Sequence, residues 1–112
     1  MTTTDLLKLE AFLPAVTAEE RAITDVYCAD LLSWAMGNAP EDGAWCTVMG
    51  NVNAVAVAAL ADVAVIVLCE NAELAEDAKQ KAAGQGVNIV TTALPAFKAA
   101  LAIAQAAGLV KP

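Results

Sequence analysis

Three cysteines carry the most reactive side chains of this chain, and its 112 residues include no histidine. The missing imidazole removes the commonest general base and metal ligand, phosphohistidine chemistry and any serine–histidine–aspartate triad. Cys28, Cys46 and Cys69 are widely spaced, whereas thiolate ligands of metals usually come in Cys-x-x-Cys pairs. We therefore expect no cofactor, no metal site, and small apolar roles for the cysteines in or beside strands. A small cysteine-dependent redox or metal-binding protein is the alternative.

A second set of chemically useful side chains follows the ends of three expected strands. These polar residues are Asn51, Asn53, Glu70, Asn71, Thr91 and Thr92. Ligands of open parallel sheets bind beyond the carboxyl ends of the strands, where helices also begin and favour anions. The set is thus a candidate cradle for a nucleotide or a small anionic metabolite. The alternative is that these residues are ordinary helix caps and turns.

Asp30 and Ser33 form a third candidate, because they lie three residues apart before an apolar segment. They are either part of a site or the start of a helix, with Asp30 as the N-cap.

The elements that position these residues alternate along the second half of the chain. The expected strands are residues 44–49, 63–69 and 87–92, and the expected helices are residues 50–62, 70–86 and 95–108. The segment 63–69 is rich in β-branched residues, as in a strand buried on both faces. Asn51 or Asn53 can cap the first helix, Gly84 and Gly86 end the second, and Pro95 suits the start of the third. With right-handed crossovers, this order predicts a parallel sheet covered by helices.

The first half is less regular, with an expected helix at residues 3–12, strands at 13–16 and 23–28, and a short helix at 30–36. We therefore predict the α/β class: a single three-layer domain over residues 1–112, with a mainly parallel sheet and flanking helices.

Large packing residues are concentrated between residues 26 and 60. They are Tyr27, Trp34, Met36, Trp45 and Met49. These side chains either anchor a subunit interface, where such residues are enriched, or supply bulk to a core that 27 alanines leave small. A core of small side chains gains from covering apolar surface in an oligomer, so we expect a homodimer.

Charge and hydropathy exclude several classes of partner. The formal charge is −7, and the six basic residues are scattered rather than clustered, which argues against nucleic acid and anionic membranes. The longest apolar runs, residues 54–61 and 63–69, are much shorter than the roughly 20 residues of a membrane span. The N-terminus has no basic start and no apolar core, so it does not look like a signal peptide. We expect a cytoplasmic protein with reduced thiols.

Residues 30–71 carry a resemblance to a known family. The matching segments are Asp30-Leu31-Leu32-Ser33, Met36, Asn38-Ala39, Trp45, Thr47, Asn53-Ala54-Val55-Ala56 and the strand VAVIVLCEN. In this order they resemble the DRTGG-domain family, and the likeness extends from about Thr4 to Leu109. Glu20-Arg21 stands where the family signature has Asp-Arg, Thr24 matches its threonine, and its two glycines are replaced near Asp25-Val26. The resemblance adds Arg21, Thr24, Asp30 and Ser33 to the candidate ligand-binding residues.

The resemblance implies a regulatory role. Domains of this family accompany catalytic domains in phosphotransacetylases and in CBS-containing pyrophosphatases, and are similar to the N-terminal domain of HPr kinase/phosphorylase. The phosphate-cradling sequence Gly-x-x-x-x-Gly-Lys-Ser/Thr of that kinase does not occur in this chain. We predict a non-catalytic regulatory or ligand-sensing protein that acts through a partner enzyme or signalling protein.

Overall fold

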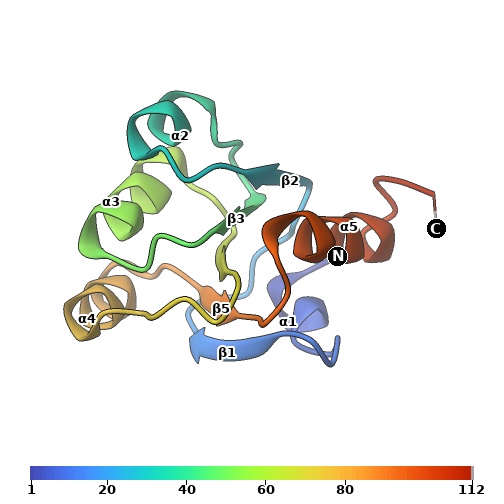
Figure 1. Cartoon of the computed structure of the whole chain (residues 1–112), viewed down its shortest axis with the longest axis horizontal. Helices are drawn as coiled ribbons and strands as arrows, with labels where there is room; N and C mark the ends of the chain where they lie inside the picture. Colours follow the sequence, from blue (N-terminus) through green and yellow to red (C-terminus); the bar gives the residue numbers. More distant parts are fainter. Residues whose placement is uncertain (112) are drawn as a thin grey trace.

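The computed structural model describes residues 1–111 and has a central five-stranded sheet with helices on both faces (Figure 1). The strands are β1 (Leu13–Val16), β2 (Asp25–Cys28), β3 (Gly43–Thr47), β4 (Val65–Leu68) and β5 (Ile89–Thr91). The helices are α1 (Thr3–Leu6), α2 (Leu32–Asn38), α3 (Val52–Ala61), α4 (Glu76–Gln85) and α5 (Ala96–Ala106). The strand order is β1-β5-β4-β3-β2, parallel throughout except for the antiparallel β1–β5 pair. The predicted α/β fold with a mainly parallel sheet is confirmed.

The two central strands are buried on both faces, as the apolar runs in the sequence predict. Every residue of β3 and β4 is buried, whereas the edge strands β1 and β2 each expose two residues. β-Branched residues suit such strands because their stiff side chains pack well on a pleated surface. Strands β3 and β4 therefore form the rigid centre to which the flanking loops are attached.

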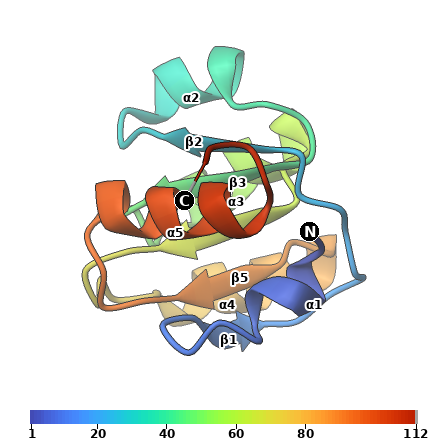
Figure 2. The same cartoon turned by 90° about the vertical axis from the view of Figure 1, so that its right-hand side faces the viewer.

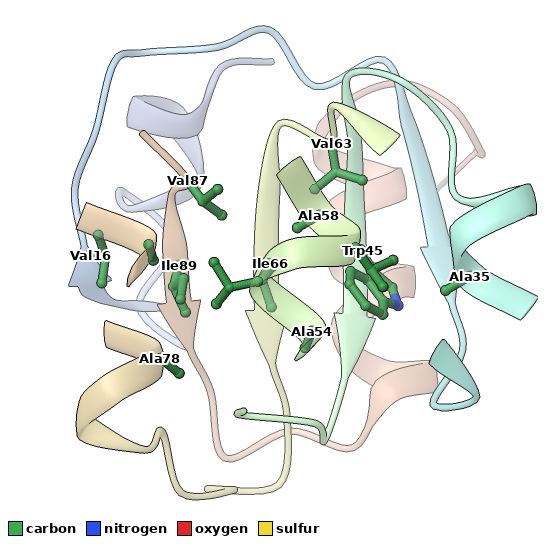
Figure 3. Packing of buried hydrophobic residues seen from close by; sticks show 13 residues of the cluster. Val16, Ala35, Trp45, Ala54, Ala58, Val63, Ile66, Ala78, Val87 and Ile89 are labelled. Atoms are coloured by element: carbon green, nitrogen blue, oxygen red, sulfur yellow. The ribbon is translucent and has the colours of Figure 1, made fainter. Parts of the chain in front are cut away.

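Helices α2, α3 and α4 cover one face of the sheet. Each connects two neighbouring parallel strands, and the three connections step across the sheet in the same direction. Right-handed crossovers then place all three on the same side. They pack on a core that includes Trp45, Ile66 and Ile89, and Ala54 and Ala58 let α3 approach the sheet closely (Figure 3).

Helices α5 and α1 lie on the opposite face (Figure 2). The core there includes Leu6, Phe12 and Ile103, together with Cys46 and Cys69.

The large residues of the segment 26–60 are divided between the core and the surface. Trp45 is completely buried in the first core, whereas Trp34 and Met36 on α2 are 62% and 54% exposed. Tyr27 and Met49 are partly buried against the core. Packing in the core thus accounts for Trp45, but it does not account for Trp34 or Met36.

Two helices are shorter than predicted by six residues at one end, whereas the bounds of the other helices agree with the prediction within two residues. Helix α1 ends at Leu6 rather than at residue 12, because three turns with hydrogen bonds between residues three apart bring both Leu6 and Phe12 into the second core. Helix α4 begins at Glu76 rather than at residue 70, because the preceding loop packs on the backbone of Gly50. The longest helix of the described chain, α5, has 11 residues, and none of the described helices has the length and apolar character needed to cross a bilayer.

A connection over residues 17–24, here called the crossing segment, carries the chain from β1 at one edge of the sheet to β2 at the other. It runs along the amino ends of the parallel strands. Asn88, buried just before β5, accepts a hydrogen bond from the Ala18 amide at 2.7 Å and donates one to the Glu19 carbonyl at 2.9 Å. The Thr3 hydroxyl accepts a hydrogen bond from the Arg21 amide at 3.0 Å. These contacts fasten the crossing segment at one end of the sheet.

The Arg21 side chain completes this attachment. Its guanidinium donates to Asp42 Oδ1 at 2.6 Å and to Asp62 Oδ1 at 3.0 Å, and also to the carbonyls of Asp62 and Val63. Both aspartates have left-handed backbones, which aspartate tolerates better than most residues. Asp42 precedes β3 and Asp62 precedes β4. The Arg21 side chain therefore connects the segment before β2 with the residues before β3 and β4. The pKa of Arg21 is raised, chiefly because Asp42 accepts its hydrogen bond.

Replacing Arg21 with methionine should lower the free energy of unfolding by about 2 kcal/mol, because four hydrogen bonds of a partly buried charged group are lost. Urea unfolding measures this change. Lys8→Met is the control, since Lys8 is paired only with Asp5 at the surface and such pairs contribute less than about 1 kcal/mol. Equal effects of the two substitutions would show that Arg21 does not hold the crossing segment.

Candidate functional site

The carboxyl ends of the four parallel strands meet at one edge of the sheet, here called the carboxyl edge. It consists of Asp30 after β2, residues 47–51 at the end of β3, Glu70 and Asn71 after β4, and Thr91 and Thr92 at the end of β5. Hydrogen bonds link neighbouring segments along the row. The Cys69 amide donates to the Thr47 carbonyl at 2.9 Å, and the Asn71 amide donates to the Thr92 carbonyl at 3.0 Å. The predicted clustering of polar residues after the strands is therefore present.

Asp30 belongs to this row and does not cap α2. Its Oδ1 atom accepts hydrogen bonds from the Thr47 hydroxyl at 2.8 Å and from the Val48 amide at 2.9 Å. The N-cap of α2 is Leu31, which makes no side-chain cap bond, so the capping interpretation of Asp30 is wrong. Asp30 bonds to the end of β3 instead, because the pairing of β2 with β3 brings Asp30 next to Thr47 and Val48. Both bonds use one carboxylate oxygen, and the side chain is exposed.

Glu70 and Asn71 occupy the point where the loops diverge to opposite faces of the sheet. The chain leaving β4 turns towards α4, whereas the chain leaving the adjacent strand β5 turns towards α5 on the other face. Such a divergence between neighbouring strands is where ligands of open α/β sheets bind. The two loops are held together by the Glu70 amide, which donates to the Leu94 carbonyl at 3.0 Å, and by the Asn71–Thr92 bond.

The backbone of Glu70 and Asn71 is left-handed, with φ values of 60° and 55°. The Ala72 amide donates to the Cys69 carbonyl at 3.0 Å, so the two residues are the centre of a tight turn that usually contains glycine or asparagine. Glutamate in this conformation costs about 1 kcal/mol. The turn leaves both side chains exposed to solvent beside the β5–α5 loop. Strain of this kind clusters at functional sites.

The loop before α4 closes the crevice between α3 and α4. A Cβ atom on Gly50 would lie 2.1 Å from the Glu73 carbonyl oxygen, so only glycine allows this approach. The Ala75 amide also donates to the Gly50 carbonyl at 2.9 Å. The apolar space beneath, lined by Met49 and Leu74 among others, has no room for a water molecule. A ligand at the carboxyl edge would therefore lie over Asp30, Glu70 and Asn71 rather than between these helices.

The remaining predicted site residues have different surroundings. Asn51 caps α3, and its side chain accepts a hydrogen bond from the Ala54 amide at 2.9 Å. Of the two predicted caps, Asn51 and Asn53, Asn51 is therefore the correct one. Thr92 is buried and its hydroxyl accepts a bond from the Leu94 amide, whereas Thr91 is partly buried. Asn53 and Ser33 are exposed in the first turns of α3 and α2.

The two residues that come only from the family signature lie elsewhere. Arg21 and Thr24 are at the amino ends of the strands, on the opposite side of the sheet from the carboxyl edge. Arg21 is occupied by Asp42 and Asp62, and the Thr24 amide donates to the Asp42 carbonyl at 3.0 Å. The structure therefore does not bring these two residues together with the other candidates.

Three residues that were not among the predicted site residues complete the description of the carboxyl edge. Thr47 is buried at the end of β3 and orients Asp30. Lys79 and Lys98 lie in the first turns of α4 and α5, which both begin on this side of the sheet, and both are exposed. A lysine near a helix start has no distinguishing sequence pattern, so only the fold reveals this placement.

A cavity of about 70 Å³ lies away from the carboxyl edge, between α1, β1 and the crossing segment. Its polar lining includes Thr3 and Asn88, whose side chains already bond to the crossing segment. Its size suits one or two water molecules. We therefore assign it no ligand.

The three cysteines lie on neighbouring strands at the carboxyl side of the sheet. Cys46 and Cys69 are fully buried in the second core, as expected for small apolar side chains, whereas Cys28 at the end of β2 is exposed. The neighbouring thiol of Cys46 lowers the pKa of Cys28 to about 7, and the same proximity raises the pKa of Cys46. Over residues 1–111, no group of three or more cysteine or carboxylate side chains has a geometry that could hold a metal ion.

The fold is similar to that of a known regulatory region. With a TM-score of 0.75 and 13% identity, 92% of this chain superposes on the crystal structure of the CBS and DRTGG domains of the regulatory region of Clostridium perfringens pyrophosphatase, complexed with its activator diadenosine tetraphosphate. This chain spans 46% of the length of that region. No protein-family model and no curated protein matches the sequence. The likeness shows that this chain has a fold found in a regulatory region.

Proposed function

We propose that this chain is a DRTGG-like, non-catalytic regulatory domain over residues 1–112 that senses a small ligand at the carboxyl edge. The observation that carries the proposal is the strained, exposed Glu70–Asn71 turn at the point where the β4 and β5 loops diverge. A superposed structure from a regulatory region, whose activator is a nucleotide, supports a sensing role.

The chemistry of the carboxyl edge favours a nucleotide over a bare anion. Asp30 and Glu70 are exposed carboxylates that would repel an isolated phosphate but accept hydrogen bonds from ribose hydroxyls. The side-chain amide of Asn71 can donate a hydrogen bond to a base edge and accept one from it. Lys79 and Lys98, in the first turns of α4 and α5, supply positive charge for phosphate groups. Hydroxyl-binding and phosphate-binding groups together fit a nucleotide.

A regulatory domain needs a surface through which it acts, and helix α2 offers one. Trp34 and Met36 on α2 are 62% and 54% exposed. Aromatic and methionine side chains are enriched in subunit interfaces. We propose that the exposed face of α2 forms a homodimer, which leaves the β2 edge with Cys28 outside the interface. The dimer in turn contacts a partner enzyme or signalling protein.

We also place this activity in the cytoplasm. All three cysteines are free, which suits a compartment that keeps thiols reduced.

A thermal-shift experiment with diadenosine tetraphosphate, ATP, AMP and inorganic phosphate tests the ligand. A nucleotide at about 100 times its Kd adds about 2.7 kcal/mol of stability, which raises the Tm of a domain of this size by roughly 10 °C. Glu70→Gly and Asn71→Ala should abolish the shift. Because Glu70→Gly relieves the left-handed strain, the unliganded variant should be as stable as the parent or more stable, by up to about 1 kcal/mol.

Thr24→Ala is the matched control, since Thr24 is exposed at the opposite edge and should leave the nucleotide shift unchanged. A shift that survives Glu70→Gly but disappears with Thr24→Ala would place the ligand at the amino ends of the strands. The absence of any nucleotide shift at millimolar concentration would contradict the sensing role.

Light scattering after size-exclusion chromatography tests the dimer. The parent chain should have twice the 11.4 kDa mass of one chain. Trp34→Lys should give a monomer, because a charge would be buried at the interface. Leu60→Lys is the control, since Leu60 is 75% exposed on α3 and lies outside the proposed interface. A parent chain that stays monomeric at about 100 micromolar, roughly a hundred times a micromolar Kd, would refute the dimer.

A further inference from the structure

We infer that Cys28 and Cys46 form a reversible disulfide when the protein meets a hydroperoxide, and that this bond is a redox device next to the carboxyl edge. The inference does not depend on the identity of the proposed ligand, because it rests on the register of β2 and β3.

The register makes Cys28 and Cys46 direct partners across two parallel strands. Neighbouring strands lie about 4.8 Å apart, and directly paired residues point to the same face of the sheet. This separation is within the roughly 4.4–6.8 Å between Cα atoms that a disulfide requires. The Ala29 amide, next along the chain, donates to the Cys46 carbonyl at 3.3 Å and keeps the two strands together at this position.

The pairing is selective among the three thiols. Cys46 is the register partner of Val67, and Cys69 follows two residues later. Two residues along a strand add about 6.6 Å, so the Cα atoms of Cys46 and Cys69 are too far apart for a bond without movement of the backbone. Cys69 is also fully buried, and its thiol donates to the Val67 carbonyl at 3.5 Å. Cys28 is therefore the only one of the three that is both exposed and aligned with a second cysteine.

The environment of Cys28 favours the reactive thiolate. The neighbouring Cys46 thiol lowers the pKa of Cys28 to about 7. Exposed thiolates with a lowered pKa and a neighbouring thiol are the ones that peroxides oxidise reversibly.

The reaction balances with a hydroperoxide as the oxidant. The Cys28 thiolate attacks the peroxide oxygen, the O–O bond breaks, and an alcohol or water leaves with one proton while Cys28 becomes a sulfenic acid. The sulfur of Cys46 then attacks the Cys28 sulfur, and the hydroxyl leaves as water with the Cys46 proton. Two thiols are oxidised by two electrons, and the peroxide is reduced by the same two. Because Asp30 is two residues from Cys28, the new bond fixes the chain beside the candidate site.

Peptide mapping after treatment with hydrogen peroxide tests the inference on the complete protein. Trypsin leaves all three cysteines in one peptide, but cleavage before aspartate separates them into Asp25–Ala29, Asp42–Ala61 and Asp62–Glu76. After free thiols are blocked, mass spectrometry under non-reducing conditions should find the first two peptides joined, with a mass lower by two hydrogens, and dithiothreitol should separate them. Cys69→Ala should leave this link intact, whereas Cys28→Ser and Cys46→Ala should abolish it.

A second measurement on the untreated protein uses the rate of alkylation by iodoacetamide. The rate at Cys28 should rise through a midpoint near pH 7, because its thiolate forms there. In Cys46→Ala the loss of the neighbouring thiol should slow the reaction at pH 7 about tenfold, as expected of an ordinary thiol. If Cys46→Ala fails to fold, the map of the parent protein alone decides. A link to Asp62–Glu76, a link between two Asp25–Ala29 peptides, or only oxygen additions at Cys28 would overturn the inference.

Discussion

The attachment of the crossing segment to the amino ends of the strands is the constraint on which the rest of the structure depends. The chain leaves β1 at one edge of the sheet and must cross to β2 at the other edge, where the row of parallel strands begins. Arg21 holds that path against the entries of β3 and β4, and Asn88 holds it against β5. The polar side chains at the amino ends of the strands are therefore bonded to other parts of the protein and serve the structure.

The opposite edge of the sheet has different properties as a consequence. Its loops are short and tied together by backbone hydrogen bonds, while Asp30, Glu70 and Asn71 are exposed to solvent. Gly50 lets the loop before α4 close the crevice behind them. A rigid backbone that presents exposed carboxylate and amide groups suits recognition of a ligand. Cys28 ends β2 on the same side, so oxidation and ligand binding would act on the same short stretch of chain.

Local patterns in the sequence were enough to predict the elements and much of the carboxyl edge. The β-branched residues of β4, the Asn51 cap and the position of Pro95 act over a few residues, and the sheet topology follows once strands and helices alternate. The cradle after the strands was predictable for the same reason, because parallel strands bring their carboxyl ends together.

Contacts between distant residues could not be predicted in this way. Asp42 and Asp62, which occupy Arg21, are 21 and 41 residues away from it, and nothing in the sequence links them. Asp30 bonds to Thr47 at a separation of 17 residues instead of capping the helix that follows it. The alignment of Cys28 with Cys46 depends on strand register, which their spacing does not reveal. The direction of β1 depends equally on its pairing with β5, at the far end of the chain.

Chemical-shift mapping of the backbone amides during titration with diadenosine tetraphosphate is the most direct measurement of the central claim. If the carboxyl edge is the sensing surface, the amide signals of Glu70, Asn71 and their neighbours along that edge should move, while those of Arg21 and Thr24 should stay in place. Signal changes confined to the crossing segment would contradict the account. So would the absence of any signal change in titrations with diadenosine tetraphosphate, ATP and AMP.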